Sequence, residues 1–422
     1  MVKMTKISIN PERLWSRLMD MSEIGEIPNN GSRRLALSQD DVDGRELFLA
    51  WCESRGYRAM FDKIGNLFIR RDGTDPDALP LAIGSHLDTQ PNGGRFDGIL
   101  GVLAGLEVLE TLDDFKIKTR APIDLVVWTN EEGARFQPAM MGSGVYCGVL
   151  DLPSVLATTD DQGISVAEET ASHGYDKGCP PGFQQIERYV ELHIEQGPIL
   201  EMEEKAIGVV TGGQGIRWYD VTLTGEETHA GPVPMRSRRD PVPALAPVVE
   251  LVYRIGQKDE NARATIGKIE TRPGSINVVP GQVCLSVDLR HPREADLVAM
   301  QEAFLNGICN IADAHPKLEV KAKCRWHSSV VQFDPEMVSG VREAAKQRNF
   351  PSMEIVSGAG HDAFNLAQVV PTTMIFVPCR DGISHNELEF TKPEHAAAGA
   401  NVLLDMALRF ANANQDALQL QE

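Results

Sequence analysis

The chain has 422 residues, and its 41 lysines and arginines against 60 aspartates and glutamates give a formal net charge of −19. This acidic excess argues against a nucleic-acid-binding or membrane-surface role, because both need clustered basic side chains. Hydrophobic residues at 42% and charged residues at 24% are typical of a folded globular chain. At roughly 150 residues per domain, the length predicts two to three domains.

The termini and the cysteines indicate where the protein resides. Residues 1–15 lack an apolar signal core, and the most apolar run, residues 99–109, is too short to span a bilayer. The seven cysteines are odd in number and include no C-x-x-C pair, which favours reduced thiols over a thiolate zinc site. We therefore predict a cytoplasmic protein.

Short apolar runs and helical patterns alternate in the first half of the chain. Residues 81–85 and 123–128 are predicted to form buried strands, with a helix over 98–112 between them. This order of elements is typical of an α/β sheet. Residues 189–194 alternate between apolar and polar, and His193 lies on the polar face of that strand.

Three glycines within residues 212–215 interrupt this pattern. Beyond them the sequence predicts strands at 218–223, 264–271 and 283–289 and helices at 242–255 and 294–312. We interpret residues 213–329 as a smaller α+β domain inserted into a catalytic domain formed by 1–212 and 330–422. The catalytic domain continues with a predicted helix at 336–348, a strand at 372–377 and a helix at 393–410.

Polar residues follow the predicted strands of the catalytic domain. His86 and Asp88 lie two apart at the end of strand 81–85, so the Asp88 carboxylate could orient the imidazole of His86. The other such residues are Asp97, Glu131, Glu132, His193 and His385. Each of them alone is more common as a hydrogen-bonded or solvent-exposed residue than as a ligand.

Taken together, three histidines and two carboxylates at the ends of separate strands are typical of a dinuclear metal site with one bridging carboxylate. Imidazole and carboxylate ligands suit zinc, manganese, cobalt or nickel. Glu131, beside Glu132, is then available to take the proton of a water molecule and pass it to a leaving amine.

Seven motifs carry a resemblance to a known family. They are GSHLDTQPNGGRFDGILGVLAGLEVL, VVWTNEEGARF, ELHIEQGPILE, ETHAGPVPM, GSINVVPG, SGAGHDA and DGISHNELE. In this order they resemble the amidase/hydantoinase/carbamoylase branch of the M20 metallopeptidase family, which includes N-carbamoyl-L-amino acid hydrolase, β-ureidopropionase and allantoate amidohydrolase. The fold implied is α/β: a mixed-sheet metallopeptidase-like catalytic domain with an inserted lid and dimerisation domain.

The resemblance assigns the metal ligands and the general base. It implies that Asp97 bridges two divalent ions in each subunit, that His86 and His193 bind one of them, and that Glu132 and His385 bind the other. Glu131 is the implied general base. Exopeptidase relatives usually have a carboxylate at the position of His193, so this residue favours the amidohydrolase branch.

The resemblance also implies roles in substrate binding. In the lid, which would form a homodimer, His229 would stabilise the oxyanion, and Asn277 and Arg290 would grip the substrate carboxylate. An ion pair with Asp288 on the same strand is the alternative role for Arg290. Residues that would line the pocket near the metals are Gln196, Gly360 and His361.

The implied reaction is hydrolysis of the carbamoyl group of an N-carbamoyl-L-amino acid or of N-carbamoyl-β-alanine to the free amino acid, carbon dioxide and ammonia. Allantoate amidohydrolase, with the same metals and another ureido substrate, is the first alternative. An aminoacylase or dipeptidase is a second, which His193 disfavours. A non-catalytic scaffold is a third, and the intact ligand set with Glu131 argues against it.

Overall fold

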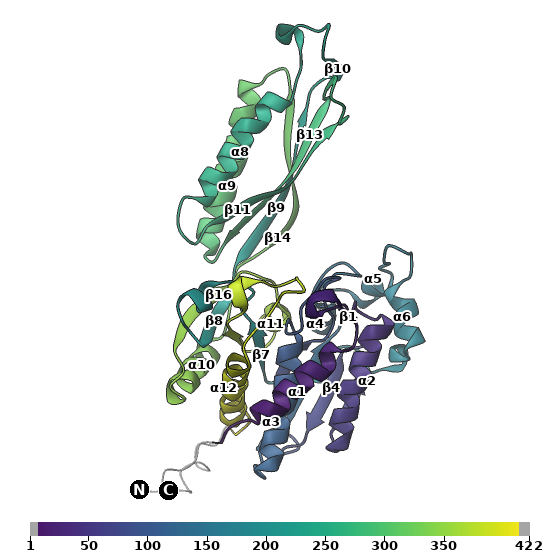
Figure 1. Ribbon diagram of the computed structural model, residues 1–422, viewed down its shortest axis with the longest axis vertical. Coiled ribbons are helices and arrows are strands. Elements are labelled where there is room, and N and C mark those ends of the chain that lie inside the picture. The colour runs from purple at the N-terminus through teal and green to yellow at the C-terminus, as the bar shows by residue number, and fades with distance from the viewer. Residues whose placement is uncertain (1–6, 413–422) are drawn as a thin grey trace. The chain divides into compact units, whose positions relative to one another are not determined.

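The computed structural model describes residues 7–412, which form two compact units (Figure 1). The first unit comprises the chain up to Gly212 and from Gln332 onward, and the second comprises Gly213–Val331.

The first unit is built on a nine-stranded mixed sheet with the order β15-β8-β17-β7-β5-β6-β4-β3, in which β16 also pairs with β8. The strands are β3 (Arg58–Phe61), β4 (Leu67–Arg71), β5 (Leu81–His86), β6 (Ile123–Trp128), β7 (Arg188–Ile194), β8 (Ile207–Gly213), β15 (Val331–Gln332), β16 (Ser352–Ser357) and β17 (Thr372–Val377). The neighbours β17, β7, β5 and β6 are parallel to one another. Every residue of β5, β6 and β17 is buried, as expected for parallel strands covered on both faces.

Helices cover this sheet. The longer ones are α1 (Pro11–Ser22), α2 (Gln39–Ser54), α3 (Ile99–Asp114), α10 (Pro335–Gln347) and α12 (Pro393–Ala411). The shorter ones are α4 (Met141–Tyr146), α5 (Leu152–Leu156), α6 (Val166–Ser172), α7 (Ile199–Met202) and α11 (Asp362–Leu366), and a small hairpin joins β1 (Glu26–Ile27) to β2 (Gly31–Ser32).

Helix α3 is buried from Ile99 to Leu112 and packs against β5, α12 and α1. Its two buried glutamates, Glu107 and Glu110, are paired with Arg13 and Arg17 of α1. These ion pairs attach the N-terminal helix to the central helix of the unit.

The second unit is an antiparallel sheet covered on one face by two helices. The sheet order is β11-β13-β9-β14, and α8 and α9 lie along it (Figure 1). The elements are β9 (Gly215–Thr224), α8 (Val242–Gly256), β11 (Arg263–Arg272), β13 (Gln282–His291), α9 (Glu294–Ala314) and β14 (Glu319–Ser328), with a separate two-stranded ladder of β10 (Thr228–His229) and β12 (Val278–Val279). Burial alternates along β13, because one side of the sheet faces the helices.

The observed architecture confirms the predicted α/β class with a mixed sheet. Among residues 7–412, no helix is both long enough and apolar enough to cross a membrane.

Candidate metal centre

The candidate site lies where the parallel strands of the first unit end. His86 is the last residue of β5, the segment 130–133 follows β6, His193 is near the end of β7, and His385 follows β17. Because these strands are parallel neighbours, their carboxyl ends meet at one edge of the sheet, which is where open α/β sheets bind ligands.

The first group of candidate ligands consists of His86, Asp97 and His193, whose ligand atoms all lie within 4.8 Å of one another. The Asp97 Oδ1 atom is 3.1 Å from Nε2 of His193 and 3.7 Å from Nε2 of His86. All three side chains are buried. Within the part of the chain that the structure describes, His86 Nε2 has no hydrogen-bond partner.

The second group consists of Asp97, Glu132 and His385, again within 4.8 Å. His385 Nε2 lies 3.5 Å from Asp97 Oδ2 and 3.3 Å from Glu132 Oε2. The two groups thus share Asp97 and use different oxygens of its carboxylate. The five residues predicted to bind metal are therefore brought together, with Asp97 between the two sets.

Backbone carbonyls set the orientation of the two buried imidazoles. His86 Nδ1 lies 2.9 Å from the carbonyl oxygen of Asp88, and His193 Nδ1 lies 2.9 Å from that of Ile194. Since a carbonyl only accepts, each Nδ1 carries the hydrogen, and each Nε2, which faces Asp97, is the atom that would bind a metal ion once it carries no proton. This is the arrangement that metal-binding histidines use.

The carboxylates of the site are buried close to one another. Burial, with the charges of Asp362 and Glu132, raises the pKa of Glu131 well above its usual range. Burial and the charge of Asp97 do the same for Glu132. Burial would also raise the pKa of Asp97, but the hydrogen bond and charge of His193 hold it far below its usual range. Such a cluster is stable only when protons or cations neutralise it, so its donors and charge fit divalent cations.

Glu131 lies beside the first group, with its Oε2 atom 3.5 Å from His86 Nε2. Its backbone N–H and that of Glu132 both donate to the carboxylate of Asp88, each over 3.2 Å. The Asp88 carboxylate is 3.9 Å from His86 Nδ1. The predicted contact to His86 is therefore made by the backbone of Asp88, because its carboxylate is turned toward the residues that follow β6.

The predicted pocket residues occupy different environments. Gln196, with a left-handed φ of 58°, donates from Nε2 to Asp97 Oδ2 over 2.8 Å and lies 3.4 Å from His385 Nε2, so it contacts two members of the second group. His361 is buried, with its ring centroid 4.5 Å from that of His193 and its Nε2 atom 3.0 Å from Ser357 Oγ. Gly360, which precedes it, is half-buried.

A third cluster combines His193 and His361 with Glu191, again with ligand atoms within 4.8 Å. Glu191 accepts hydrogen bonds from Ser85 Oγ over 2.7 Å and from the backbone N–H of Ala363 over 3.0 Å. Burial lowers the pKa of His361 well below its usual range, so its ring is neutral. The ring of His361 therefore packs against that of the candidate ligand His193, and Glu191 is held close to both.

Three residues of the site were not anticipated from the sequence. Gln90 Nε2 donates to Glu132 Oε2 over 2.8 Å, and Ser384 Oγ donates to Asp97 Oδ2 over 2.7 Å. Glu389 is buried and accepts hydrogen bonds from the backbone N–H groups of Phe96 and Asp97. The available signal was that Ser384 and Glu389 lie in the same motif as His385.

The remaining candidates lie in the second unit. His229 and Asn277 are exposed and close together, because His229 pairs with Val278 and the N–H of Ala230 donates to the Asn277 carbonyl over 2.9 Å. Arg290 forms an ion pair with Asp288 at 2.8 Å. The ion pair considered as the alternative role of Arg290 is therefore present.

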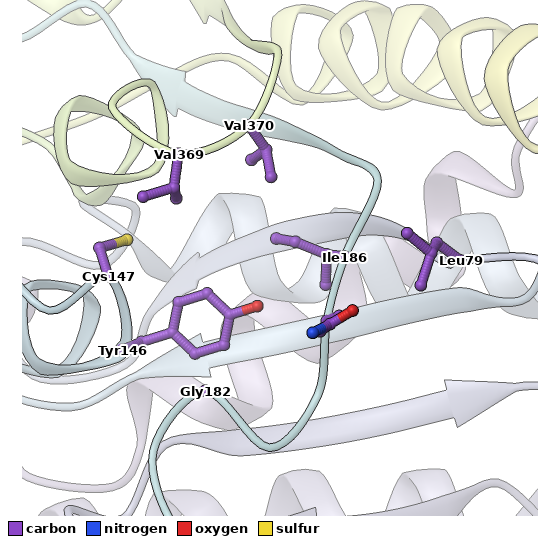
Figure 2. A pocket seen from close by; sticks show the side chains of 8 residues that line it. Leu79, Tyr146, Cys147, Gly182, Ile186, Val369 and Val370 are labelled. Carbon is purple, nitrogen blue, oxygen red and sulfur yellow. The ribbon is translucent and has the colours of Figure 1, made fainter.

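A separate cavity of about 250 Å³ lies elsewhere in the first unit (Figure 2). Its lining consists of Leu79, Tyr146, Cys147, Gly182, Gln185, Ile186, Val369 and Val370. Burial raises the pKa of the Cys147 thiol to about 12, so this cysteine is not an activated nucleophile. Since the lining is mostly apolar and includes none of the predicted site residues, this cavity is distinct from the metal centre.

Known proteins are similar to this chain over nearly its whole length. Residues 82–409 match peptidase family M20/M25/M40. An N-carbamoyl-L-amino-acid amidohydrolase from Rhizobium meliloti is 46% identical over 407 residues, covering 96% of this chain and 97% of that protein. An allantoate amidohydrolase from Bacillus subtilis is 34% identical over 406 residues, covering 93% of this chain and 95% of that protein.

A solved structure of the same family is also similar to this chain. An amidase of the hydantoinase/carbamoylase family from Burkholderia multivorans has a TM-score of 0.91 and 49% identity, covering 96% of this chain and 99% of that one. The family expected from the motifs is thereby confirmed. The chain is a metal-dependent hydrolase of amide C–N bonds that belongs to peptidase family M20/M25/M40, in its amidase/hydantoinase/carbamoylase branch.

Proposed function

We propose that this enzyme hydrolyses the carbamoyl group of N-carbamoyl-L-amino acids or N-carbamoyl-β-alanine, yielding the free amino acid, carbon dioxide and ammonia. The observation that carries the proposal is the pair of ligand groups sharing Asp97, with Glu131 beside them. The substrate class is supported by the relative from Rhizobium meliloti, an N-carbamoyl-L-amino-acid amidohydrolase.

The proposal includes two divalent ions per chain, zinc, manganese, cobalt or nickel. His86 and His193 would hold one ion, Glu132 and His385 the other, and Asp97 both. When bound, such ions lower the pKa of a water molecule and polarise the carbonyl that it attacks.

The chain's own groups would handle the proton and the developing charge. Glu131 would take the proton from the attacking water and pass it to the nitrogen that leaves as the C–N bond breaks. Its position supports this role, because its Oε2 atom lies 3.5 Å from His86 Nε2, beside the first group of candidate ligands. Asp88 would hold Glu131 in place through the backbone N–H.

Groups outside the candidate ligand set would bind the substrate. His229 would donate to the carbonyl oxygen as it becomes negative, and Asn277 and Arg290 would bind the substrate carboxylate. The ion pair of Arg290 with Asp288 is the competing role, so the guanidinium would have to exchange Asp288 for the substrate carboxylate. Gln196, Gly360 and His361 would line or support the pocket next to the metals.

The decisive experiment measures ammonia release by metal-reconstituted protein on N-carbamoyl-β-alanine, several N-carbamoyl-L-amino acids and allantoate in parallel. N-acetyl-amino acids are included, with release of the free amine as readout. We expect turnover of the carbamoyl substrates. Activity confined to allantoate would support the alternative suggested by the Bacillus subtilis relative, and activity confined to the acetyl substrates would make the enzyme an aminoacylase.

We also propose that the chain forms a homodimer through its second unit and acts in the cytoplasm on a small ureido substrate. Light scattering coupled to size exclusion tests the dimer: a molar mass of twice the chain is expected, and a monomeric mass contradicts it. Cell fractionation tests the location.

A further inference from the structure

Glu389 contacts the bridging ligand of the metal centre from an unexpected side. Its Oε1 atom accepts hydrogen bonds from the backbone N–H groups of Phe96, over 2.9 Å, and Asp97, over 3.0 Å. Its Oε2 atom lies 3.0 Å from Ser384 Oγ, which is itself 2.7 Å from Asp97 Oδ2. The Glu389 side chain, which is 4% exposed, therefore contacts the backbone of Asp97 directly. It is linked to the carboxylate of Asp97 through Ser384 Oγ.

Glu389 lies on the same segment of the chain as His385. Glu389 lies four residues after His385, on the segment between β17 and α12, and its own N–H donates to the carbonyl of Asn386 over 3.0 Å. The segment that supplies His385 thus also holds the loop that supplies Asp97. The loop approaches so closely that a Cβ atom on Gly94 would lie 2.1 Å from Glu389 Oε1.

We propose that Glu389 is a positioning residue that fixes Asp97 relative to His385 and thereby determines how tightly the second metal ion binds. This inference rests on the proposed assignment of the metal ligands. In the second group, Asp97 and His385 come from the two loops that Glu389 joins. The first group also uses Asp97, but its other two members, His86 and His193, come from β5 and β7, which are paired directly with each other in the sheet, so a shift of Asp97 is expected to affect the first ion less.

The physical argument concerns two buried backbone donors. If Glu389 no longer accepts from the N–H groups of Phe96 and Asp97, the loop must move until both find another acceptor, because a buried unpaired N–H is unfavourable. A shift of this loop moves Asp97 away from His385. Groups that hold ligands in place typically contribute 10-fold to 100-fold to metal affinity.

Two substitutions separate positioning from charge. Glu389→Gln keeps an oxygen that accepts from Phe96 and Asp97, and its amide can donate to Ser384 Oγ. Glu389→Met has a similar length but no acceptor oxygen. The matched control is Glu107→Met, which removes another buried glutamate of the same unit that accepts a backbone N–H, that of Asn10, over 2.8 Å.

The experiment titrates metal-free full-length protein with Zn²⁺ by calorimetry, and with Co²⁺ by its visible absorption, alongside thermal unfolding. Wild type and Glu389→Gln are expected to bind two equivalents with similar affinities. Glu389→Met is expected to bind the second equivalent at least about 10-fold more weakly. Glu107→Met is expected to lower the melting temperature and leave both affinities unchanged.

Several outcomes would overturn the inference. They are a wild-type chain that binds only one equivalent, a Glu389→Met variant that binds the second as tightly as wild type, and a Glu389→Gln variant as weak as Glu389→Met. The last result would show that the charge matters and not the acceptor. If Glu389→Met does not fold, Glu389→Asp replaces it, since its shorter side chain withdraws the acceptors, and wild-type affinity in that variant would contradict the proposal.

Failure of the proposed function would look different. Wild-type protein that binds two ions but releases no ammonia or amine from any of the tested substrates would refute the substrate class. The effect of Glu389 on the second ion would still be measurable.

Discussion

The candidate residues of the two units differ in how firmly they are held. In the first unit, His86 and His193 are buried and each has its second ring nitrogen bonded to a backbone carbonyl. In the second unit, His229 is exposed, and its Nδ1 atom accepts a local bond from the N–H of Gly231 over 3.0 Å. The first set is organised before any ligand arrives, whereas the second can adapt to a substrate. Changes in the first unit should therefore alter metal binding, and changes in the second should alter substrate affinity.

Removing the metals is expected to have the largest effect. Dialysis against a chelator should abolish activity, and adding back Zn²⁺ or Mn²⁺ should restore it. The metal-free protein should also melt at a lower temperature, because an ion present at 100 times its dissociation constant stabilises the folded state by about 2.7 kcal/mol. Unchanged activity after verified removal of the metal would contradict this interpretation of the first unit.

Glu131→Gln should lower kcat by about 10²-fold to 10⁴-fold, the usual contribution of a general base, while the protein keeps two ions per chain. The substitution preserves shape and removes only the ability to carry the proton. Steady-state kinetics with metal analysis checks this. A variant with full activity would exclude Glu131 as the base.

Arg290→Lys tests the second unit. A planar guanidinium binds a carboxylate through two parallel hydrogen bonds, which an ammonium group cannot reproduce. We expect KM to rise roughly 10-fold to 100-fold, since a hydrogen bond to a charged group contributes about 1.5–3 kcal/mol. Metal content should stay the same. If metal affinity fell while KM did not change, the contrast between the units would be wrong.

Asp88→Asn should have the smallest effect. The amide keeps one oxygen acceptor but turns an NH₂ group toward one of the two backbone N–H groups of Glu131 and Glu132. Metal affinity is expected to fall by about 10-fold. Calorimetry on the metal-free variant measures this, and a normal affinity would mean that the backbone carbonyl of Asp88 alone orients the site.

The buried strands of the first unit could be predicted from the sequence because they are continuous apolar runs. The runs 123–128 and 372–377 coincide with β6 and β17, and 81–85 lies within β5. Strand β14 was missed although Val320, Ala322, Cys324 and Trp326 alternate with polar residues in its sequence, EVKAKCRWHS; this apolar side is weak, because most residues of the strand are exposed and Val320 and Ala322 are only partly buried against the core. The order of the parallel strands, with β7 between β17 and β5, is set by tertiary packing and has no local signal.

In the candidate site, too, some features could be predicted from the sequence and others could not. Residue types and motifs were enough to predict that His86, Glu132, His193 and His385 gather around Asp97, but they did not point to Ser384, which also contacts it. The contacts that orient them were not predictable, because backbone groups supply many of them. One example is the hydrogen bond between His86 and the carbonyl of Asp88. Others are the hydrogen bonds from the N–H groups of Phe96 and Asp97 to Glu389. All of them depend on the backbone conformation of the loops. A sequence motif identifies side chains and does not reveal the backbone around them.

The ion pairs between α1 and α3 bear on how the protein can be shortened for study. Deleting residues 11–22 would remove Arg13 and Arg17 and leave Glu107 buried without either arginine that α1 provides. Glu110 would keep its ion pair with Arg55, at 3.1 Å. Breaking a buried ion pair by removing one partner costs about 3–5 kcal/mol, a large part of the stability of a typical domain. We therefore expect a truncated expression clone to be less stable than the full chain, with the loss centred on α3.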